Sequence, residues 1–237
     1  DASDQAVQQQ LSQQLKQWPN VKLLTNASQM GACYTRNLAI AHASGEFITG
    51  LDDDDEFETQ RIAEFVRNWR QEDGFLCSGY QFILTAGRMV RSGRQARPIA
   101  PAQLLEVNLV GNQIFTKTAY LKDIGGFDPE LVACQDYDVW IRLALAYGGG
   151  RRLASFSYIV HQEHEHERIS TQSRRLLGHQ QLIDKHQHLM SAQQIASQLF
   201  YRQLQSGATI HLSMLRHTHW RHWLVILKVW GVQKYSA

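Results

Sequence analysis

The sequence predicts an α/β domain in which helices alternate with the strands of a largely parallel central sheet. With 237 residues and 43% hydrophobic content, the chain is long enough to bury one sizeable core. Apolar residues recur at helical spacing in some segments and in short continuous runs in others, and this alternation is typical of a layered α/β domain. The net charge of +2 does not indicate a disordered chain or a general nucleic-acid binder, so no nucleic-acid partner is expected.

Three helix–strand units are expected in the first part of the chain. A Gln-rich helix over residues 5–17 precedes a short strand over residues 21–25. The other expected elements are a helix over residues 32–43, a strand over 46–51, a helix over 59–70 and a strand over 75–84. In the third helix Phe65 and Trp69 lie at helical spacing, while Arg61 is expected to face solvent.

The rest of the chain continues the alternation and then becomes helical. A basic segment over residues 88–97 is either a solvated turn or a contact for an anionic acceptor. Beyond it we expect a short helix after Pro101, a strand near 113–115, a helix over 118–123, an amphipathic helix over 135–147 and a strand over 152–160. From about residue 170 the pattern is helical. We therefore expect a core domain over residues 1–170 and a helical C-terminal extension over residues 171–237.

Composition also bears on location. The cysteines Cys33, Cys77 and Cys134 are odd in number and widely spaced, which favours reduced thiols in the cytoplasm over a disulfide framework or a zinc cluster. No apolar run approaches the roughly 20 residues that span a bilayer. Residues 217–232 combine Trp with Arg and Lys, which suits an interfacial helix on the inner face of an anionic membrane and equally a helix docked on the domain.

The strongest chemical signal is a run of four aspartates, residues 52–55, directly after a strand. The carboxyl ends of strands in open α/β sheets face the ligand crevice, and hard divalent cations prefer oxygen ligands. Alternation gives Asp52 and Asp54 a shared orientation, so the pattern predicts that these two bind Mn²⁺ or Mg²⁺ and a diphosphate. Asp55 lies on the other side, and Asp53 adds charge to the same site. A solvated acidic loop is the alternative interpretation.

A second acidic pair stands at the start of the helix over 135–147. The helix dipole keeps Asp136 ionised, and an ionised carboxylate can accept the proton of a hydroxyl group. Asp138 is the competing candidate for that role, and both residues are also suited simply to cap the helix. Further on, residues 161–170 alternate His with Glu, which indicates either metal binding or a charged loop.

Several of these segments together resemble the family 2 glycosyltransferases, which are inverting enzymes of GT-A fold. Residues 26–55 share with them an Asn, a Gly, a Thr-Arg-Asn helix, a Gly-Glu strand and an Asp-x-Asp motif. Residues 125–128 are similar to the family's Gly-Gly-Phe-Asp segment, and residues 135–142 to its Glu-Asp-x-x-Leu-Trp-x-Arg helix. The resemblance covers about residues 1–170 and implies a GT-A layered fold with a mostly parallel central sheet. It also implies that the family's first strand lies upstream of Asp1.

The resemblance assigns roles to particular residues. Asp1 and Ser3 look like the end of the family's nucleotide-contacting loop, and Asp136 matches the general base. Gln135 stands where Glu is more usual in the family, which leaves any role of that Glu open. His161 is the nearest match to a family His beside the metal and diphosphate. Arg36 is suited to offset phosphate charge, to brace the aspartate loop or to form a structural ion pair.

The implied function is sugar transfer from a nucleoside-diphosphate sugar, with a UDP-sugar favoured, to a hydroxyl of a saccharide or lipid-linked acceptor. The family leads us to expect a role in bacterial surface polysaccharide or glycan synthesis. Two alternatives stay open at this point: a nucleotidyltransferase of related fold, and a non-catalytic fragment that binds a sugar or a partner.

Overall fold

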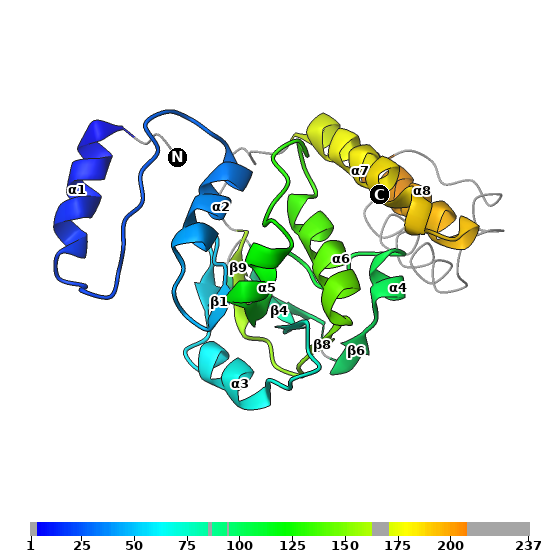
Figure 1. The fold of residues 1–237 in the computed structure, drawn as a ribbon, viewed down its shortest axis with the longest axis horizontal. Coiled ribbons are helices and arrows are strands. Elements are labelled where there is room, and N and C mark those ends of the chain that lie inside the picture. The colour runs from blue at the N-terminus through cyan, green and yellow to red at the C-terminus, as the bar shows by residue number, and fades with distance from the viewer. Residues whose placement is uncertain (1–3, 85–86, 94, 163–170, 208–237) are drawn as a thin grey trace.

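The computed structural model describes residues 4–84, 87–93, 95–162 and 171–207. Its helices are α1 (Gln5–Leu15), α2 (Ala32–His42), α3 (Arg61–Asn68), α4 (Pro101–Leu104), α5 (Thr118–Asp123), α6 (Gln135–Tyr147), α7 (Gln172–His186) and α8 (Ala192–Gln205) (Figure 1). Its strands are β1 (Phe47–Thr49), β2 (Glu56–Phe57), β3 (Phe75–Cys77), β4 (Tyr80–Ile83), β5 (Met89–Ser92), β6 (Arg97–Ile99), β7 (Phe115–Lys117), β8 (Gly150–Arg152) and β9 (Tyr158–His161). Helical and strand segments broadly follow the expected order, but β3 to β6 come in succession with no described α-helix between them.

The strands form two mixed sheets rather than one mostly parallel sheet. The larger has the order β1-β7-β3-β8-β6 and the smaller the order β2-β9-β4-β5. Strands β1, β3 and β8 run in one direction, whereas β7 and β6 run in the other. The expectation of a mostly parallel sheet is therefore wrong, because β7 is inserted between β1 and β3 and is antiparallel to both. Apolar periodicity reports which strands are buried, but it carries no information about the direction of a neighbour.

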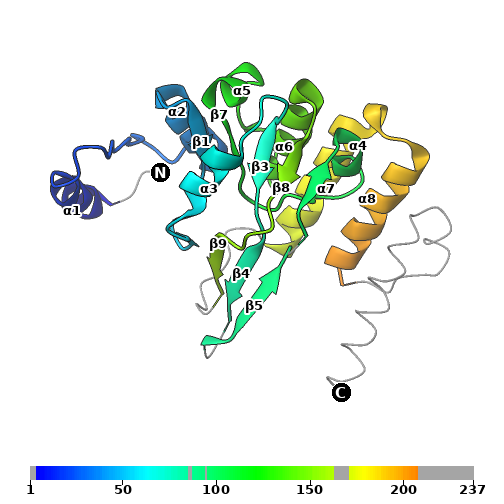
Figure 2. The same ribbon diagram turned by 90° about the horizontal axis from the view of Figure 1, so that it is seen from below.

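Helices cover both faces of the larger sheet, and β3 shows how its side chains are divided between them. Phe75 and Cys77 pack into the larger core cluster with residues of α2, α5 and α6. Leu76 points to the opposite face, where it packs with Phe65 of α3 and with Phe115 of β7. This period of two is what a strand buried on both faces requires. Figure 2 shows the sheet between these helices, with the hairpin of β4 and β5 extending away from it.

Two long apolar runs each bend and supply strands to both sheets. The run over 75–84 forms two strands, β3 and β4. The run over 152–160 begins at the end of β8 and continues into β9. At the first bend the backbone N–H of Gly79 donates to the Ser155 carbonyl oxygen. The two segments therefore pass side by side from one sheet to the other. The bends, over residues 78–79 and 153–157, contain no proline or charged residue that would interrupt a strand pattern, which is why the sequence predicts one strand in each place.

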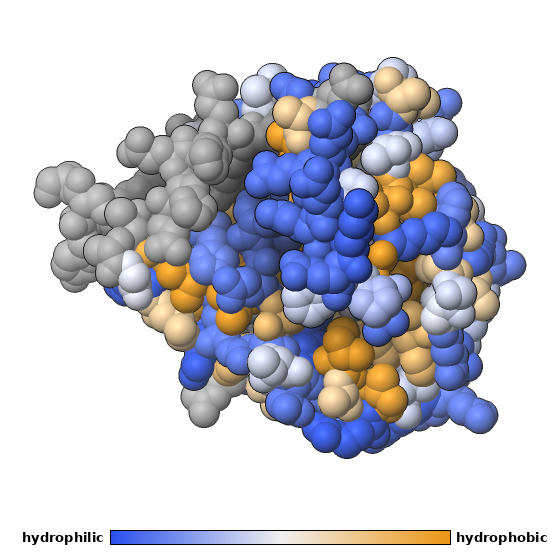
Figure 3. All heavy atoms as spheres, turned by 90° about the vertical axis from the view of Figure 1, so that its left-hand side faces the viewer, coloured by the Kyte–Doolittle hydropathy of each residue, from blue (hydrophilic) through white to orange (hydrophobic). Residues whose placement is uncertain are grey.

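The N-terminal part of the described chain lies apart from the body, and α1 stands to one side of it (Figure 1). Seen from that side in Figure 3, the surface is mainly hydrophilic, with hydrophobic residues in separate patches. The expected strand over residues 21–25 does not form, and Val21 is 49% exposed. A strand needs a hydrogen-bonding neighbour, and residues 21–25 pair with none of the described strands.

The C-terminal helices pack on the core rather than standing off from it. Leu182 of α7 is fully buried within the same cluster as Phe75 and Trp140, and Phe200 of α8 is also fully buried. The division at residue 170 remains a prediction about domains, but α7 shares the core of the preceding residues. Within the described part of the chain, no helix is both long enough and apolar enough to cross a membrane.

Candidate active site

The acidic run forms a turn directly after β1, and the pairing of β1 with β7 fixes what it faces. In that antiparallel pair Phe47 lies opposite Lys117 and Thr49 opposite Phe115. The same register, continued past the strand ends, places Asp52 opposite Asn112. The side chains do meet: Asn112 Nδ2 donates to Asp52 Oδ2 at 3.0 Å, and Gln113 Nε2 donates to Asp52 Oδ1 at 3.3 Å. Both oxygens of Asp52 are thus oriented by amide groups.

The half-buried Tyr80 and the buried Trp140 hold the loop that carries these amides. The Tyr80 hydroxyl accepts from the Asn112 backbone N–H at 3.1 Å and donates to the Val110 carbonyl oxygen at 3.0 Å. Trp140 Nε1 donates to the Gly111 carbonyl oxygen at 2.9 Å. Since Trp140 belongs to α6, the helix of the second acidic pair also fixes the loop beside the first.

The other aspartates of the run differ in exposure and partners. Asp53 and Asp54 are exposed, whereas Asp55 is half-buried against β9. Asp55 Oδ1 accepts from the His161 backbone N–H at 3.2 Å, and the Asp52 backbone N–H donates to the Tyr158 hydroxyl at 3.3 Å. Burial raises the pKa of Asp55 above its ordinary value, although hydrogen bonds from Tyr158 and His161 oppose that rise. The turn is therefore anchored at both ends while Asp54 stays accessible.

Arg61 lies behind this turn and is buried, contrary to the expectation that it faces solvent. The residue is 1% exposed, and its guanidinium carbon lies 4.6, 4.5 and 5.3 Å from the ring centres of Phe57, Phe65 and Tyr158. Nη1 donates to the hydroxyls of Ser78 at 2.7 Å and Ser157 at 3.0 Å. Burial lowers the pKa of Arg61 to about 10. The sequence places Arg61 on a helix, but only the packing of β2 and β9 against α3 turns it inward.

Arg36 of α2 lies between the acidic turn and the ring of Phe127. Its Nη2 lies 3.5 Å from Asp52 Oδ1, and its guanidinium carbon lies 5.4 Å from the centre of the Phe127 ring. This is a long, partly exposed ion pair, so the bond to Asp52 contributes little stability by itself. Of the roles considered for Arg36, bracing the aspartate turn and forming a structural ion pair both agree with this geometry, and the role toward phosphate stays a prediction.

Asp136 lies in the first turn of α6, half-buried and near both Arg36 and Asp52. Burial raises the pKa of Asp136 to about 6, although the hydrogen bond from the Tyr137 backbone and the charge of Arg36 lower it, and the charge of Asp52 adds to the rise. Asp52, Arg36 and Asp136, from three separate elements, thus lie within range of one another's charges. A carboxyl group that titrates near pH 6 is ionised at neutral pH and remains basic enough to take a proton from a hydroxyl.

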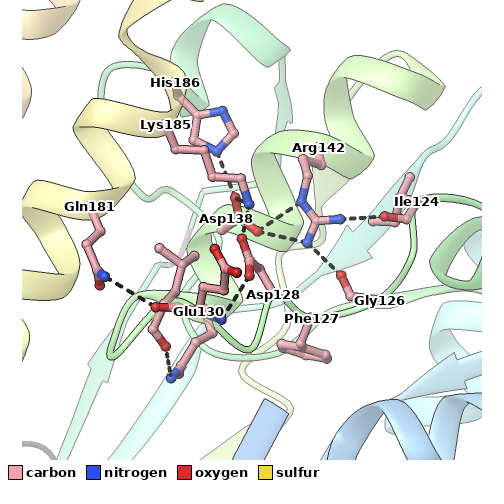
Figure 4. A network of polar contacts seen from close by, with 12 residues as sticks. Ile124, Gly126, Phe127, Asp128, Glu130, Asp138, Arg142, Gln181, Lys185 and His186 are labelled. Carbon is pink, nitrogen blue, oxygen red and sulfur yellow. Dashed lines mark hydrogen bonds and ion pairs between the residues drawn. The ribbon is translucent and has the colours of Figure 1, made fainter. Parts of the chain in front are cut away.

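Asp138, the competing candidate, is fully buried and engaged by three donors (Figure 4). His186 Nε2 and Lys185 Nζ lie 2.8 and 2.9 Å from its Oδ1, and Arg142 Nη2 lies 2.8 Å from its Oδ2. Burial alone would raise the pKa of Asp138, but the hydrogen bonds from His186, Arg142 and Lys185 lower it well below its ordinary value. Such a carboxylate is a poor proton acceptor, so the geometry separates a structural acid from an available one.

The Gly-Gly-Phe-Asp turn is joined to α2 by one side chain. Asn37 Nδ2 donates to the Phe127 carbonyl oxygen, and Asn37 Oδ1 accepts from the Phe127 backbone N–H, both at 2.7 Å. Gly126 has a φ of 66°, and a Cβ at that position would lie 2.3 Å from Asn37 Oδ1. Only glycine allows both this backbone conformation and this approach.

Of the remaining candidate residues, His161 borders the acidic turn, and the others lie elsewhere or outside the described residues. Asp1, Ser3 and residues 217–232 are outside them. His161 is described, and its Nε2 lies 3.4 Å from Glu56 Oε1. Gln135 uses its side-chain amide to donate to the Leu131 carbonyl oxygen at 2.9 Å. In the basic segment, Arg91 donates to Gln81 Oε1 at 3.0 Å from Nη2 and at 3.1 Å from Nε.

Asn112 and Gln113 are site residues that the sequence pattern does not single out. They come just before β7, and Asp52 comes just after β1. In an antiparallel pair, the residues before one strand lie beside the residues after the other, so these amides could be predicted to meet Asp52. Making that prediction requires knowing that β1 and β7 pair, which the sequence does not show.

No group of three or more His, Cys, Asp and Glu side chains that could hold a metal ion occurs among the described residues. Mg²⁺ characteristically takes one or two protein carboxylates and completes its shell with substrate phosphates and waters. An oriented Asp52 and an exposed Asp54 on one turn suit that mode of binding.

Comparison with known sequences identifies the family. The sequence pattern of the family described as "Glycosyl transferase family 2" matches residues 1–124, which is more than half of the chain. The chain belongs to glycosyl transferase family 2. A protein of Escherichia coli (strain K12) that is named for colanic acid biosynthesis as glycosyl transferase WcaA is 28% identical over 219 residues. That alignment covers 89% of this chain and 74% of WcaA.

Solved structures share the fold. The structure of S. aureus TarS 1-349 in complex with UDP-GlcNAc has a TM-score of 0.63 at 18% identity. The mannosyltransferase PcManGT from Pyrobaculum calidifontis, in complex with GDP-Man and Mn²⁺, has a TM-score of 0.52 at 15% identity. Each covers 91% of this chain, and this chain spans 66% of each, slightly less than two thirds. The expected GT-A fold is confirmed.

Proposed function

We propose that this chain is an inverting glycosyltransferase that moves a sugar from a nucleoside-diphosphate sugar to a hydroxyl group. A UDP-sugar is the favoured donor, and a saccharide or lipid-linked molecule in bacterial surface polysaccharide synthesis is the acceptor. The observation that carries this proposal is the convergence of Asp52, Arg36 and Asp136 beside an accessible Asp54. Membership of the family and the likeness to WcaA support it.

Asp52 and Asp54 would hold a Mn²⁺ or Mg²⁺ ion together with the donor diphosphate. When bound, the ion neutralises the charge that develops on the leaving diphosphate. The Mn²⁺ in the PcManGT complex supports this assignment. Asp53 adds negative charge to the turn, and Arg36 supplies a cation beside it. Asp1 and Ser3, by the family resemblance, would contact the nucleotide, and His161 is proposed at the metal and diphosphate.

Asp136 would act as the base in the transfer step. Its carboxylate accepts the proton of the acceptor hydroxyl, and the acceptor oxygen forms a bond to the anomeric carbon. The bond between that carbon and the diphosphate oxygen breaks, and its electron pair leaves with the nucleoside diphosphate. Because attack occurs on the face opposite the leaving group, the configuration at the anomeric carbon inverts. Asp138 would take no part, since its oxygens are engaged by Lys185, His186 and Arg142.

The location that fits this role is the cytoplasm, at the inner face of the membrane, where nucleotide sugars and lipid-linked acceptors meet. Residues 217–232, the proposed membrane contact, lie outside the described residues.

The test is a titration of the purified protein with UDP-glucose, UDP-galactose, UDP-GlcNAc and GDP-mannose, in Mn²⁺ and in EDTA. We expect binding of at least one donor in Mn²⁺ and its loss in EDTA. Asp54→Asn should abolish this binding, whereas Asp136→Asn should preserve it and remove transfer. Metal-dependent binding without turnover under any acceptor condition would favour a non-catalytic binding module. The absence of binding of every sugar nucleotide would refute the proposal.

A further inference from the structure

The segment over residues 128–138, here called the base segment, lacks an ordinary helix cap. It leads from the Gly-Gly-Phe-Asp turn into α6 and carries Asp136. Cys134 occupies the cap position with φ 60° and ψ 22°, the left-handed region, and no side chain caps the helix. A non-glycine residue persists in that conformation only where its surroundings over-determine it. Something outside the base segment must therefore hold it.

One face of α7 contacts the base segment along its length. Gln181 Oε1 accepts from the Val132 backbone N–H at 3.1 Å, and Gln181 Nε2 donates to the Glu130 carbonyl oxygen at 3.2 Å. Lys185, one turn further along the helix, reaches Asp128 Oδ2 at 2.6 Å and Asp138 Oδ1 at 2.9 Å. These contacts secure the segment at its beginning, in its middle and at its end.

Backbone packing matches these polar contacts. Gly178 lies on the same face of α7, three residues before Gln181. A Cβ at Gly178 would lie 2.6 Å from the backbone nitrogen of Ala133. The absence of a side chain at residue 178 thus lets the residue before Cys134 approach the helix backbone.

Asp138 joins α7 to the rest of the active-site frame (Figure 4). Besides Lys185, it binds His186 of α7 and Arg142 of its own helix. Arg142 in turn donates to the carbonyl oxygens of Ile124 at 2.7 Å and Gly126 at 2.6 Å. One fully buried carboxylate therefore ties α7, α6 and the Gly-Gly-Phe-Asp turn together.

From this geometry we infer that α7 is a template for the base segment, and that Lys185 and His186 are positioning residues for Asp136. The inference rests on the proposed function of Asp136 as the base. It extends the active unit beyond residues 1–124, the part that matches the family description.

The template acts on Asp136 and not on the donor site. Asp136 lies two residues before Asp138 in the same helical turn, so a shift of Asp138 also moves Asp136. A misplacement of a catalytic group by about 1 Å costs on the order of 10²-fold in rate. Asp52 is oriented from elsewhere, by Asn112 and Gln113 before β7 and by Arg36 of α2. Losing the template should therefore lower kcat while leaving donor binding intact.

The charges near Asp136 give a second readout. It feels the charges of Arg36 from α2 and Asp52 from the turn after β1, while Lys185 neutralises Asp128 and Asp138, the second of which follows Asp136 by two residues on the same helix. Removing Lys185 leaves those carboxylates less compensated. The added negative potential favours the protonated form of Asp136, so the acid limb of the pH–rate profile should move to higher pH.

The experiment compares Lys185→Met with Arg174→Met, which removes a cation from an exposed position of the same helix. Donor-site integrity is read from binding of UDP with Mn²⁺, and transfer from UDP release with the UDP-sugar that the wild-type protein turns over. We expect Lys185→Met to lower kcat about 10- to 100-fold, to change the Kd of UDP less than twofold, and to shift the acid limb upward. Arg174→Met should change none of these.

The inference is overturned if folded Lys185→Met keeps kcat within twofold of wild type, or if UDP affinity falls in proportion to kcat. Should Lys185→Met fail to fold, Gln181→Ala removes two hydrogen bonds without a charge, and a loss of kcat with unchanged UDP binding is again required. A wild-type protein that neither binds nor turns over sugar nucleotides would refute the proposed function instead. The two failures are therefore distinguishable.

Discussion

Replacing Asp136 by Asn should make the protein more stable at alkaline pH while removing its activity. Burial raises the pKa of Asp136 from an ordinary 3.8 to about 6 in the folded protein. Folding therefore favours the protonated form. The contribution of this group to stability is fully present below its unfolded pKa and is lost as the pH rises through about 6. Above that pH the ionised carboxylate opposes folding, and one pKa unit corresponds to about 1.4 kcal/mol.

The magnitude follows from the size of the shift. The full difference corresponds to about 3 kcal/mol at pH 8, and partial exposure reduces the expected gain in the free energy of unfolding to about 2 kcal/mol. Asn at residue 136 keeps an oxygen that can accept from the Tyr137 backbone N–H, so the helix start is preserved. For a chain of this length, about 2 kcal/mol raises Tm by about 4 to 8 °C. At pH 4 the gain should fall to about a fifth of its value at pH 8, because Asp136 of the wild type is then mostly protonated when folded and about half protonated when unfolded.

The assay is thermal unfolding at pH 8 and pH 4 in EDTA, which keeps bound metal from contributing. Asp184→Asn, at an exposed carboxylate of α7, is the control and should show no pH-dependent gain. Transfer by Asp136→Asn should fall by about 10² to 10⁴-fold, the range of general base catalysis. An Asp136→Asn protein no more stable than wild type at pH 8, or equally stabilised at pH 4, would refute this account of Asp136.

Two further substitutions test the frame around the site by urea unfolding. Gly126→Ala should lower the free energy of unfolding by about 1–3 kcal/mol, because its Cβ would lie 2.3 Å from Asn37 Oδ1 at positive φ. The control is Gly125→Ala, which has φ 77° and no atom within 4 Å of its Cβ and should therefore cost less. Equal losses in the two variants would contradict the role of Asn37. The free energy of unfolding of Arg61→Met should stay within about 1 kcal/mol of wild type, because an apolar side chain suits the aromatic surroundings and the Ser78 and Ser157 hydroxyls, 2.9 Å apart, can bond to each other. Arg61→Ala should lose about 2–5 kcal/mol, because it leaves a cavity. Equal losses in these two variants would show that the guanidinium hydrogen bonds dominate.

Sequence alone is sufficient for the order of helices and strands over most of the described chain, and for the family. The aspartate turn after β1 and the acidic start of α6 are local features, set by neighbouring residues in the chain. For that reason pattern and motif are enough to locate Asp52, Asp54 and Asp136.

Which acids are available, and what orients them, depends on packing between distant segments. Asp136 and Asp138 are equivalent as local sequence, yet only packing against α7 supplies Lys185 and His186 to Asp138. Asn112 reaches Asp52 because β7 runs antiparallel to β1, and strand direction leaves no trace in apolar periodicity. Arg61 occupies a position at the start of α3 that the sequence predicts to be solvated, and the rings of β2 and β9 close over it. Long-range pairing fixes each of these outcomes, and the residues that pair lie far apart in the sequence.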